Sequence, residues 1–167
     1  MPTSIGFRVD PKKVTYGTVK GPSDKGKFTV LGVGEVCVPY ALQVPRQLRL
    51  VRTTLLDIIE DTGSTRAGLR IGEGTAKRKD PFRLNLEGVV QELLASSDVE
   101  RFVAGPIATI ASLLGEDDRT VIKRYVEGTK PDLLQTAWAD FDGLQREALL
   151  IALCAGLSTP TDGASIK

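Results

Sequence analysis

The sequence contains no histidine among its 167 residues. This absence excludes histidine-dependent proteolytic triads, zinc sites of the H-E-x-x-H type and acid–base chemistry that relies on imidazole. The chain has only two cysteines, Cys37 and Cys154, which are too few for a Cys₄ zinc site and form no C-x-x-C pair. Any catalysis is therefore expected to depend on carboxylates, lysines, hydroxyl groups or a bound metal ion.

Long apolar runs are also missing. The longest, residues 148–157, spans half of the ~20 residues that cross a bilayer, so it predicts one buried helix. The N-terminus runs directly into the strand-like residues 5–9, with no signal peptide before them. So few cysteines are typical of a reducing compartment. We therefore expect a cytoplasmic protein without a membrane partner.

Charge is unevenly distributed, although the net charge is only +1. Residues 1–83 carry 15 Lys/Arg against 8 Asp/Glu, whereas residues 84–167 carry 7 against 13. A basic half of this kind attracts polyanions such as nucleic acid, and scattered solvated charge is the alternative interpretation.

The hydrophobic periodicity predicts an α/β fold in which helices flank a mixed five-stranded sheet. Strands are predicted at residues 4–10, 14–20, 27–38, 67–71 and 101–104. Helices are predicted at residues 45–62, 84–96, 119–126 and 143–155, and Pro106 opens a further segment through Leu114. The length suits one domain, which we place at residues 1–157, followed by a polar tail at 158–167.

Three acids lie where a site can be built. Asp10 ends the first strand, Glu73 ends the fourth, and Glu147 lies in the first turns of the last helix. Strand ends of an α/β sheet converge on one edge, and Asp142 or Asp140 before the last helix can add a further carboxylate. Clustered carboxylates repel one another, and Mg²⁺ or Mn²⁺ relieves that repulsion and activates water for phosphodiester hydrolysis. For each acid alone, a solvated surface charge or a cap is the alternative.

Basic and aromatic residues accompany these acids along the chain. They predict phosphate contacts that provide affinity without sequence preference. Phe82 is a candidate for stacking on an unpaired base, with a packing role at the start of a helix as the alternative. The predicted DNA-binding residues are Lys12, Lys13, Lys77, Arg78, Lys79, Arg83 and Phe82.

Ordered motifs between residues 4 and 157 resemble the RuvC family of Holliday-junction resolvases. The segment Ile5-Gly6-Phe7-Arg8-Val9-Asp10-Pro11 is similar to the family's first strand and Asp-Pro turn, with a matching second strand from Val14 to Val19. Residues 66–73 are similar to the strand that carries the second acid. Residues 102–106 and 117–125 are similar to a later strand and helix, and residues 146–154 to the last helix.

The resemblance implies a ribonuclease H-like fold, a homodimer and Mg²⁺-dependent endonuclease cleavage of branched DNA in recombination and repair. Asp10, Glu73 and Glu147 would be metal ligands and catalytic residues, and Asp142 would assist.

Two alternative functions remain open. The family's last helix carries two acids three residues apart, and Leu144 stands three residues before Glu147. One alternative is therefore a catalytically impaired ribonuclease H-like domain that binds nucleic acid or a protein partner. The other is a nuclease that processes RNA.

Overall fold

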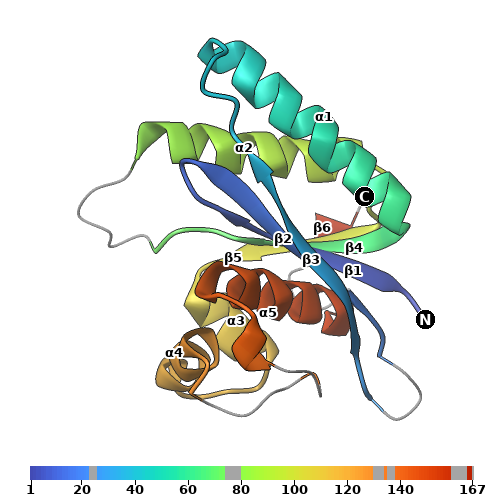
Figure 1. Ribbon diagram of the computed structural model, residues 1–167. Coiled ribbons are helices and arrows are strands. Elements are labelled where there is room, and N and C mark those ends of the chain that lie inside the picture. The colour runs from blue at the N-terminus through green and yellow to red at the C-terminus, as the bar shows by residue number, and fades with distance from the viewer. Residues whose placement is uncertain (23–25, 74–79, 130–133, 135–137, 159–164, 167) are drawn as a thin grey trace.

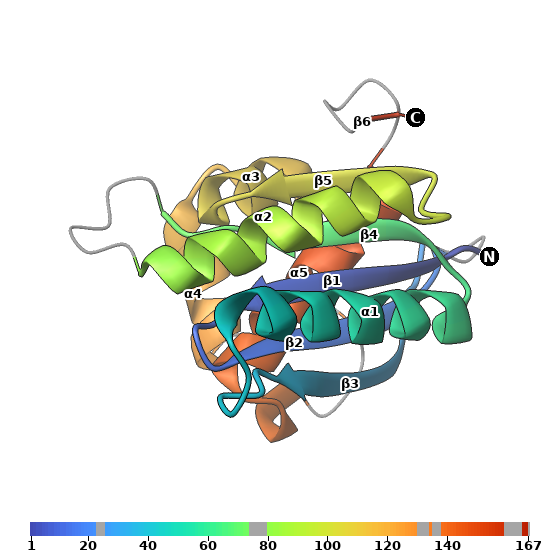
Figure 2. The ribbon, with the colours of Figure 1, turned by 90° about the horizontal axis from the view of Figure 1, so that it is seen from above.

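The computed structural model describes residues 1–22, 26–73, 80–129, 134, 138–158 and 165–166. One mixed β-sheet runs through the molecule, with helices on both faces (Figures 1 and 2). The strand order is β3-β2-β1-β4-β5-β6. The strands are β1 (Thr3–Val9), β2 (Lys13–Lys20), β3 (Thr29–Cys37), β4 (Ser64–Arg70), β5 (Arg101–Gly105) and β6 (Ser165–Ile166). The predicted α/β fold with a mixed sheet is therefore confirmed, and the segment predicted as a tail adds a two-residue sixth strand.

Strand direction changes across the sheet. β1, β2 and β3 form an antiparallel meander, whereas β4 pairs parallel with β1, and β5 pairs parallel with β4. Because β1, β4 and β5 are parallel, their carboxyl ends meet at one edge of the sheet. Asp10 and Glu73 follow two neighbouring strands at this edge.

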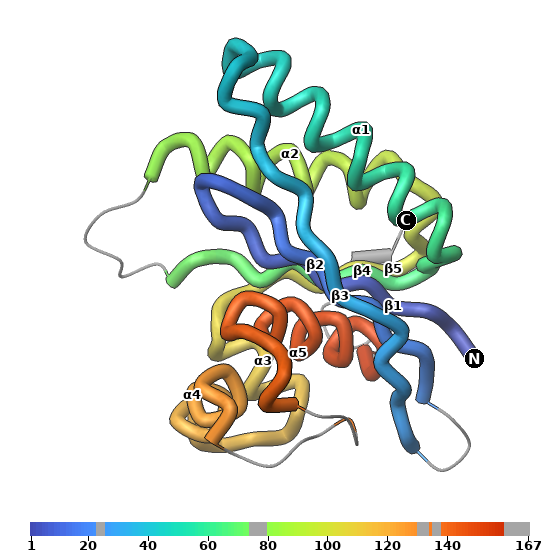
Figure 3. The backbone as a smooth tube through the Cα atoms, in the orientation of Figure 1, coloured from blue at the N-terminus to red at the C-terminus, as the bar shows by residue number. Residues whose placement is uncertain are grey.

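Helices cover both faces of the sheet, with one pair on one face and the remaining described helices on the other (Figure 3). The first pair is α1 (Val44–Thr62) and α2 (Pro81–Ser96). The opposite face carries α3 (Ile107–Leu113), α4 (Arg119–Glu127) and α5 (Gly143–Leu157), with a 3₁₀ turn at Trp138–Asp140. Within the described ranges, no helix combines the length and the apolar character needed to cross a bilayer.

Helix α2 begins three residues earlier than the periodicity predicts. Asp80 is its N-cap and accepts a hydrogen bond from the Arg83 amide at 2.9 Å, and Pro81 occupies the first helical position. These capping signals lie before the apolar spacing from which a helix over residues 84–96 is predicted. Local capping therefore determined this boundary.

β1 is covered on both faces, so its alternate side chains contact different layers. Ile5, Phe7 and Val9 are buried in the cluster that also contains the apolar faces of α1 and α2. The intervening positions face α5. A Cβ added to Gly6 would meet the Ala148 carbonyl oxygen and lie 2.6 Å from the Ala152 amide nitrogen. Only a glycine permits so close a helix–strand approach.

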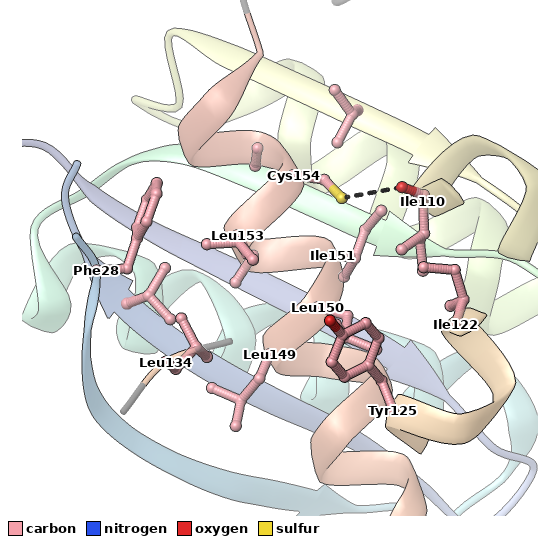
Figure 4. Close-up of a cluster of buried hydrophobic side chains, with 14 of the residues drawn as sticks. Phe28, Ile110, Ile122, Tyr125, Leu134, Leu149, Leu150, Ile151, Leu153 and Cys154 are labelled. Atoms are coloured by element: carbon pink, nitrogen blue, oxygen red, sulfur yellow. Dashed lines mark hydrogen bonds between the residues drawn. The ribbon is translucent and has the colours of Figure 1, made fainter. Parts of the chain in front are cut away.

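The central helix of the second cluster is α5, which is apolar on every side over residues 148–155 (Figure 4). A helix that is buried all round is expected to be hydrophobic all round. Cys154 lies on this helix and donates a weak hydrogen bond to the Ile110 carbonyl oxygen at 3.9 Å. Burial raises the pKa of the Cys154 thiol to about 12.

Candidate functional site at the sheet edge

The first turns of α5 lie against the carboxyl end of β1. Contacts run in reverse order along the two elements: Gly156 lies beside Ser4, whereas Glu147 pairs with Arg8. The helix therefore runs antiparallel to β1, and its N-terminal end reaches the edge where Asp10 and Glu73 follow their strands. The three elements that carry the predicted acids therefore end at the same edge of the sheet.

Two arginines meet Glu147 at this edge. Its Oε2 atom lies 3.0 Å from Nε of Arg8 and 2.9 Å from Nε of Arg70. All three side chains are largely shielded from water: exposure is 14% for Arg8, 12% for Glu147 and 4% for Arg70. Because charges in a poorly solvated environment need compensation, each arginine holds the glutamate in place and is itself stabilised by it.

Arg70 also contacts Glu73. Its Nη2 atom lies 3.0 Å from Glu73 Oε1, which accepts a second hydrogen bond from the Ile107 amide at 3.0 Å. The Ile107 amide belongs to the first residue of α3, so Glu73 joins the end of β4 to that helix. Burial lowers the pKa of Arg70 below its ordinary value, while the charge of Glu147 opposes this effect. One guanidinium thus bridges two of the three predicted acids.

Asp10 has local partners instead. Its Oδ1 atom accepts the Lys12 amide at 2.9 Å, and its backbone forms hydrogen bonds with Lys13 in both directions. This is the geometry of an Asx turn, which joins β1 to β2. Among the described residues, no three aspartate, glutamate or cysteine side chains gather closely enough to hold a metal ion.

Asp142 is the N-cap of α5. Its Oδ1 accepts the Gln145 amide at 2.8 Å, and Gln145 Oε1 accepts the Asp142 amide at 2.9 Å, which completes a capping box. Asp140 is exposed in the preceding 3₁₀ turn, and Leu144 is half-buried on α5. The helix therefore contributes one carboxylate, Glu147, to the arginine network.

The partners available at this edge do not suit a divalent cation. Arg70 Nη1 is buried and has no hydrogen-bond partner among the described residues. The Nε atoms of Arg8 and Arg70 form ion pairs with Glu147 Oε2. These three atoms are buried, and their contacts do not have the geometry of hydrogen bonds. A cation such as Mg²⁺ requires free oxygen ligands, so the residues as arranged do not fit it.

The predicted basic residues have different surroundings. Lys12 is exposed on the β1–β2 turn, whereas Lys13 forms an ion pair with Glu35 on β3. The Lys13 pKa is raised, mainly by its hydrogen bond to Glu35. Lys77, Arg78 and Lys79 lie outside the described residues.

Arg83 and Phe82 belong to the packing of α2. Arg83 donates to Glu87 Oε1 from Nε at 3.1 Å and from Nη2 at 3.0 Å, and the same oxygen accepts the Gly72 amide at 3.2 Å. This network ties α2 to the segment that follows β4. Phe82 is half-buried against the cluster beneath α1 and α2. The contacts therefore support the packing alternative for Phe82, and its role in stacking stays a prediction.

Sequence reasoning overlooked Arg8, Arg70 and Arg146. Arg8 interrupts a buried strand between Phe7 and Val9, and a charge in such a strand signals a partner of opposite charge. Arg146 donates to the carbonyl oxygens of Trp138 at 3.0 Å, Val126 at 3.1 Å and Ala139 at 3.2 Å. It thereby fixes the entry of the chain into α5, beside Glu147.

Comparison of whole structures identifies the fold. The chain is similar to a Thermus thermophilus RuvC in complex with a Holliday-junction substrate: the TM-score is 0.70 at 13% identity, and the match covers 99% of each chain. A second Thermus thermophilus RuvC structure matches with a TM-score of 0.68 at 12% identity, again over 99% of each chain. The yeast mitochondrial Holliday-junction resolvase Ydc2 matches with a TM-score of 0.53 at 13% identity, over 93% of this chain and 79% of that one.

Sequence comparisons add no relative, since no family model and no curated protein matches the chain. The structural matches confirm the expected RuvC-like, ribonuclease H-like fold. They extend along nearly the whole chain, so the fold includes the edge that carries the arginine network.

Proposed function

We propose that this chain binds branched DNA, through a fold that it shares with Holliday-junction resolvases. The full-length match to a RuvC in complex with a junction substrate is the observation that carries the proposal. The basic character of the first 83 residues supports it, because phosphate neutralisation dominates protein–DNA affinity. Hydrolysis is not required for this function, and the arginines at the sheet edge are compatible with it.

Lys12 is the predicted phosphate contact with the clearest surroundings. It is exposed on the turn beside Asp10, at the same edge of the sheet as Arg8 and Arg70. We expect Lys77, Arg78 and Lys79, which follow Glu73 in the chain, to contact the same backbone. Arg83 and Lys13 would contribute less, since each already has a carboxylate partner.

Fluorescence anisotropy tests the proposal with a four-way junction and a linear duplex of matched sequence. We expect tighter binding to the junction, with an affinity that falls steeply as salt concentration rises. Lys12→Gln should weaken binding and reduce the log–log salt slope by about one. Lys123→Gln, at an exposed position on α4, is the matched control and should behave like the wild type.

Equal affinity for junction and duplex would reject the preference for branched DNA. Tighter binding to a structured RNA would favour the RNA alternative. Binding in a two-to-one protein–junction complex, measured by light scattering, would support the expected homodimer.

A second candidate function is metal-dependent cleavage of the branched DNA. Glu73 and Glu147 contact the same Arg70 guanidinium, which brings two of the expected ligands together. In this alternative Asp10, Glu73 and Glu147 would hold Mg²⁺ or Mn²⁺ once Arg8 and Arg70 had moved away from the carboxylates, and Asp142 would assist. Cleavage of a labelled junction that is lost in Asp10→Asn and Glu73→Gln would establish it, and an intact junction would leave DNA binding as the function.

A further inference from the structure

The positive charge between Glu73 and Glu147 is supplied by the protein itself. Arg70 lies 3.0 Å from one carboxylate and 2.9 Å from the other, and Arg8 adds a second guanidinium to Glu147. Two arginines therefore face two glutamates, and the formal charges of the four groups cancel. Carboxylates brought together from β4 and α5 need such compensation, whether it comes from a metal ion or from a side chain.

We infer that Arg70, assisted by Arg8, occupies the position that a divalent cation would take between these carboxylates. The edge of the sheet is thus a metal-independent ion-pair network in the wild-type protein. The inference concerns the same acids as the second candidate function, and its test requires no DNA. Its failure can therefore be distinguished from a failure of the proposed DNA binding.

Burial favours arginine over a metal ion at this position. Arg70 is almost completely enclosed, and its guanidinium keeps its charge at any physiological pH. A metal ion that bound Glu147 Oε2 would displace both arginines from that oxygen, and the displaced charges would lose this partner in a poorly solvated environment. Mg²⁺ also loses its water ligands reluctantly. Replacement of the arginines by a metal ion is therefore unfavourable both for the arginines, which lose an ion pair, and for the ion, which loses water ligands.

Asp10 does not provide the additional ligand that would favour a metal ion at this position. Its carboxylate accepts the Lys12 amide in the turn, and it belongs to no group of three possible ligands among the described residues. Two glutamates, both already paired, are a poor site for a hard cation. Removing the arginines should reverse the preference, since it would leave the carboxylates of Glu73 and Glu147 uncompensated.

Thermal unfolding with and without MnCl₂ tests the inference, and electron paramagnetic resonance counts the bound Mn²⁺. The wild type should bind no Mn²⁺ at millimolar concentration, and its melting temperature should not change. The double variant Arg8→Gln/Arg70→Gln should bind Mn²⁺. At a concentration 100-fold above Kd, the melting temperature should rise by about 5–10 °C.

Two controls separate replacement of a cation from general destabilisation. Arg70→Lys retains a positive charge and should not bind Mn²⁺. Arg52→Gln removes a surface ion pair with Glu92 and should also leave Mn²⁺ binding absent. If the double variant does not fold, the resonance measurement on the wild type and on Arg70→Lys still decides.

Stoichiometric Mn²⁺ binding by the wild type that disappears in Glu147→Gln would overturn the inference and favour the nuclease. A folded double variant that binds no Mn²⁺ would overturn it as well, because the acids would then not form a cation position.

Discussion

The Nε atom of Arg70 on β4 lies 2.9 Å from Oε2 of Glu147 on α5, with both side chains largely withdrawn from solvent. This contact joins the end of a central strand to the start of the helix that forms the centre of the second core cluster. It lies at the sheet edge where the sequence predicted clustered carboxylates and a metal ion. The edge is therefore organised by opposite charges.

Removal of the carboxylate from this contact should destabilise the protein. Glu147→Gln leaves Arg8 without its carboxylate partner and Arg70 with Glu73 alone, and removal of one member of a buried ion pair typically costs about 3 kcal/mol. Urea unfolding measures the loss as a lower midpoint with an unchanged slope. Glu92→Gln is the control, since its pair with Arg52 lies on the surface and should contribute nothing measurable. A Glu147→Gln variant as stable as the wild type would show that the two arginines do not depend on it.

The close approach of α5 to β1 should depend on Gly6. A methyl group there would collide with backbone atoms of residues 148 and 152, which cannot move independently of the helix. We expect Gly6→Ala to lower the free energy of unfolding by about 3 kcal/mol, at the upper end for an overpacked core. Gly32→Ala on β3 is the matched control, because no heavy atom lies within 4 Å of the added methyl group. Equal unfolding midpoints for the two variants would contradict this account of the packing.

The two cysteines should react very differently with a thiol reagent. Cys37 is exposed on β3, whereas Cys154 is buried and its pKa is about 12. Only the thiolate is reactive, so at pH 8 Cys154 is both protonated and inaccessible. Mass spectrometry after iodoacetamide treatment should show one modified cysteine in the native protein and two in denaturant. The native Cys37→Ser variant should remain unmodified, and rapid modification of Cys154 in it would show that α5 opens readily.

Helices and strands could be predicted because their signals are local. Alternating apolar residues mark β1, and Gly63 ends α1 with a left-handed backbone conformation that favours glycine. Asp118 caps α4 through the Thr120 amide, at the start of the helix predicted over residues 119–126. The order of these elements and the motifs within them were sufficient to anticipate the ribonuclease H-like fold. The start of α2 was placed too late because a proline and a cap, rather than apolar spacing, define it.

The sequence by itself determined the elements, the apolar character of α5 and the three strand and helix ends that carry acids. Only the tertiary structure decided which charges would meet at those ends. Arg8, Arg70 and Glu147 are far apart in the chain, and their sequence positions alone do not show that they meet. Packing of α5 across β1 and β4 removed water from all three at once, and in that environment each charge requires a partner of opposite sign.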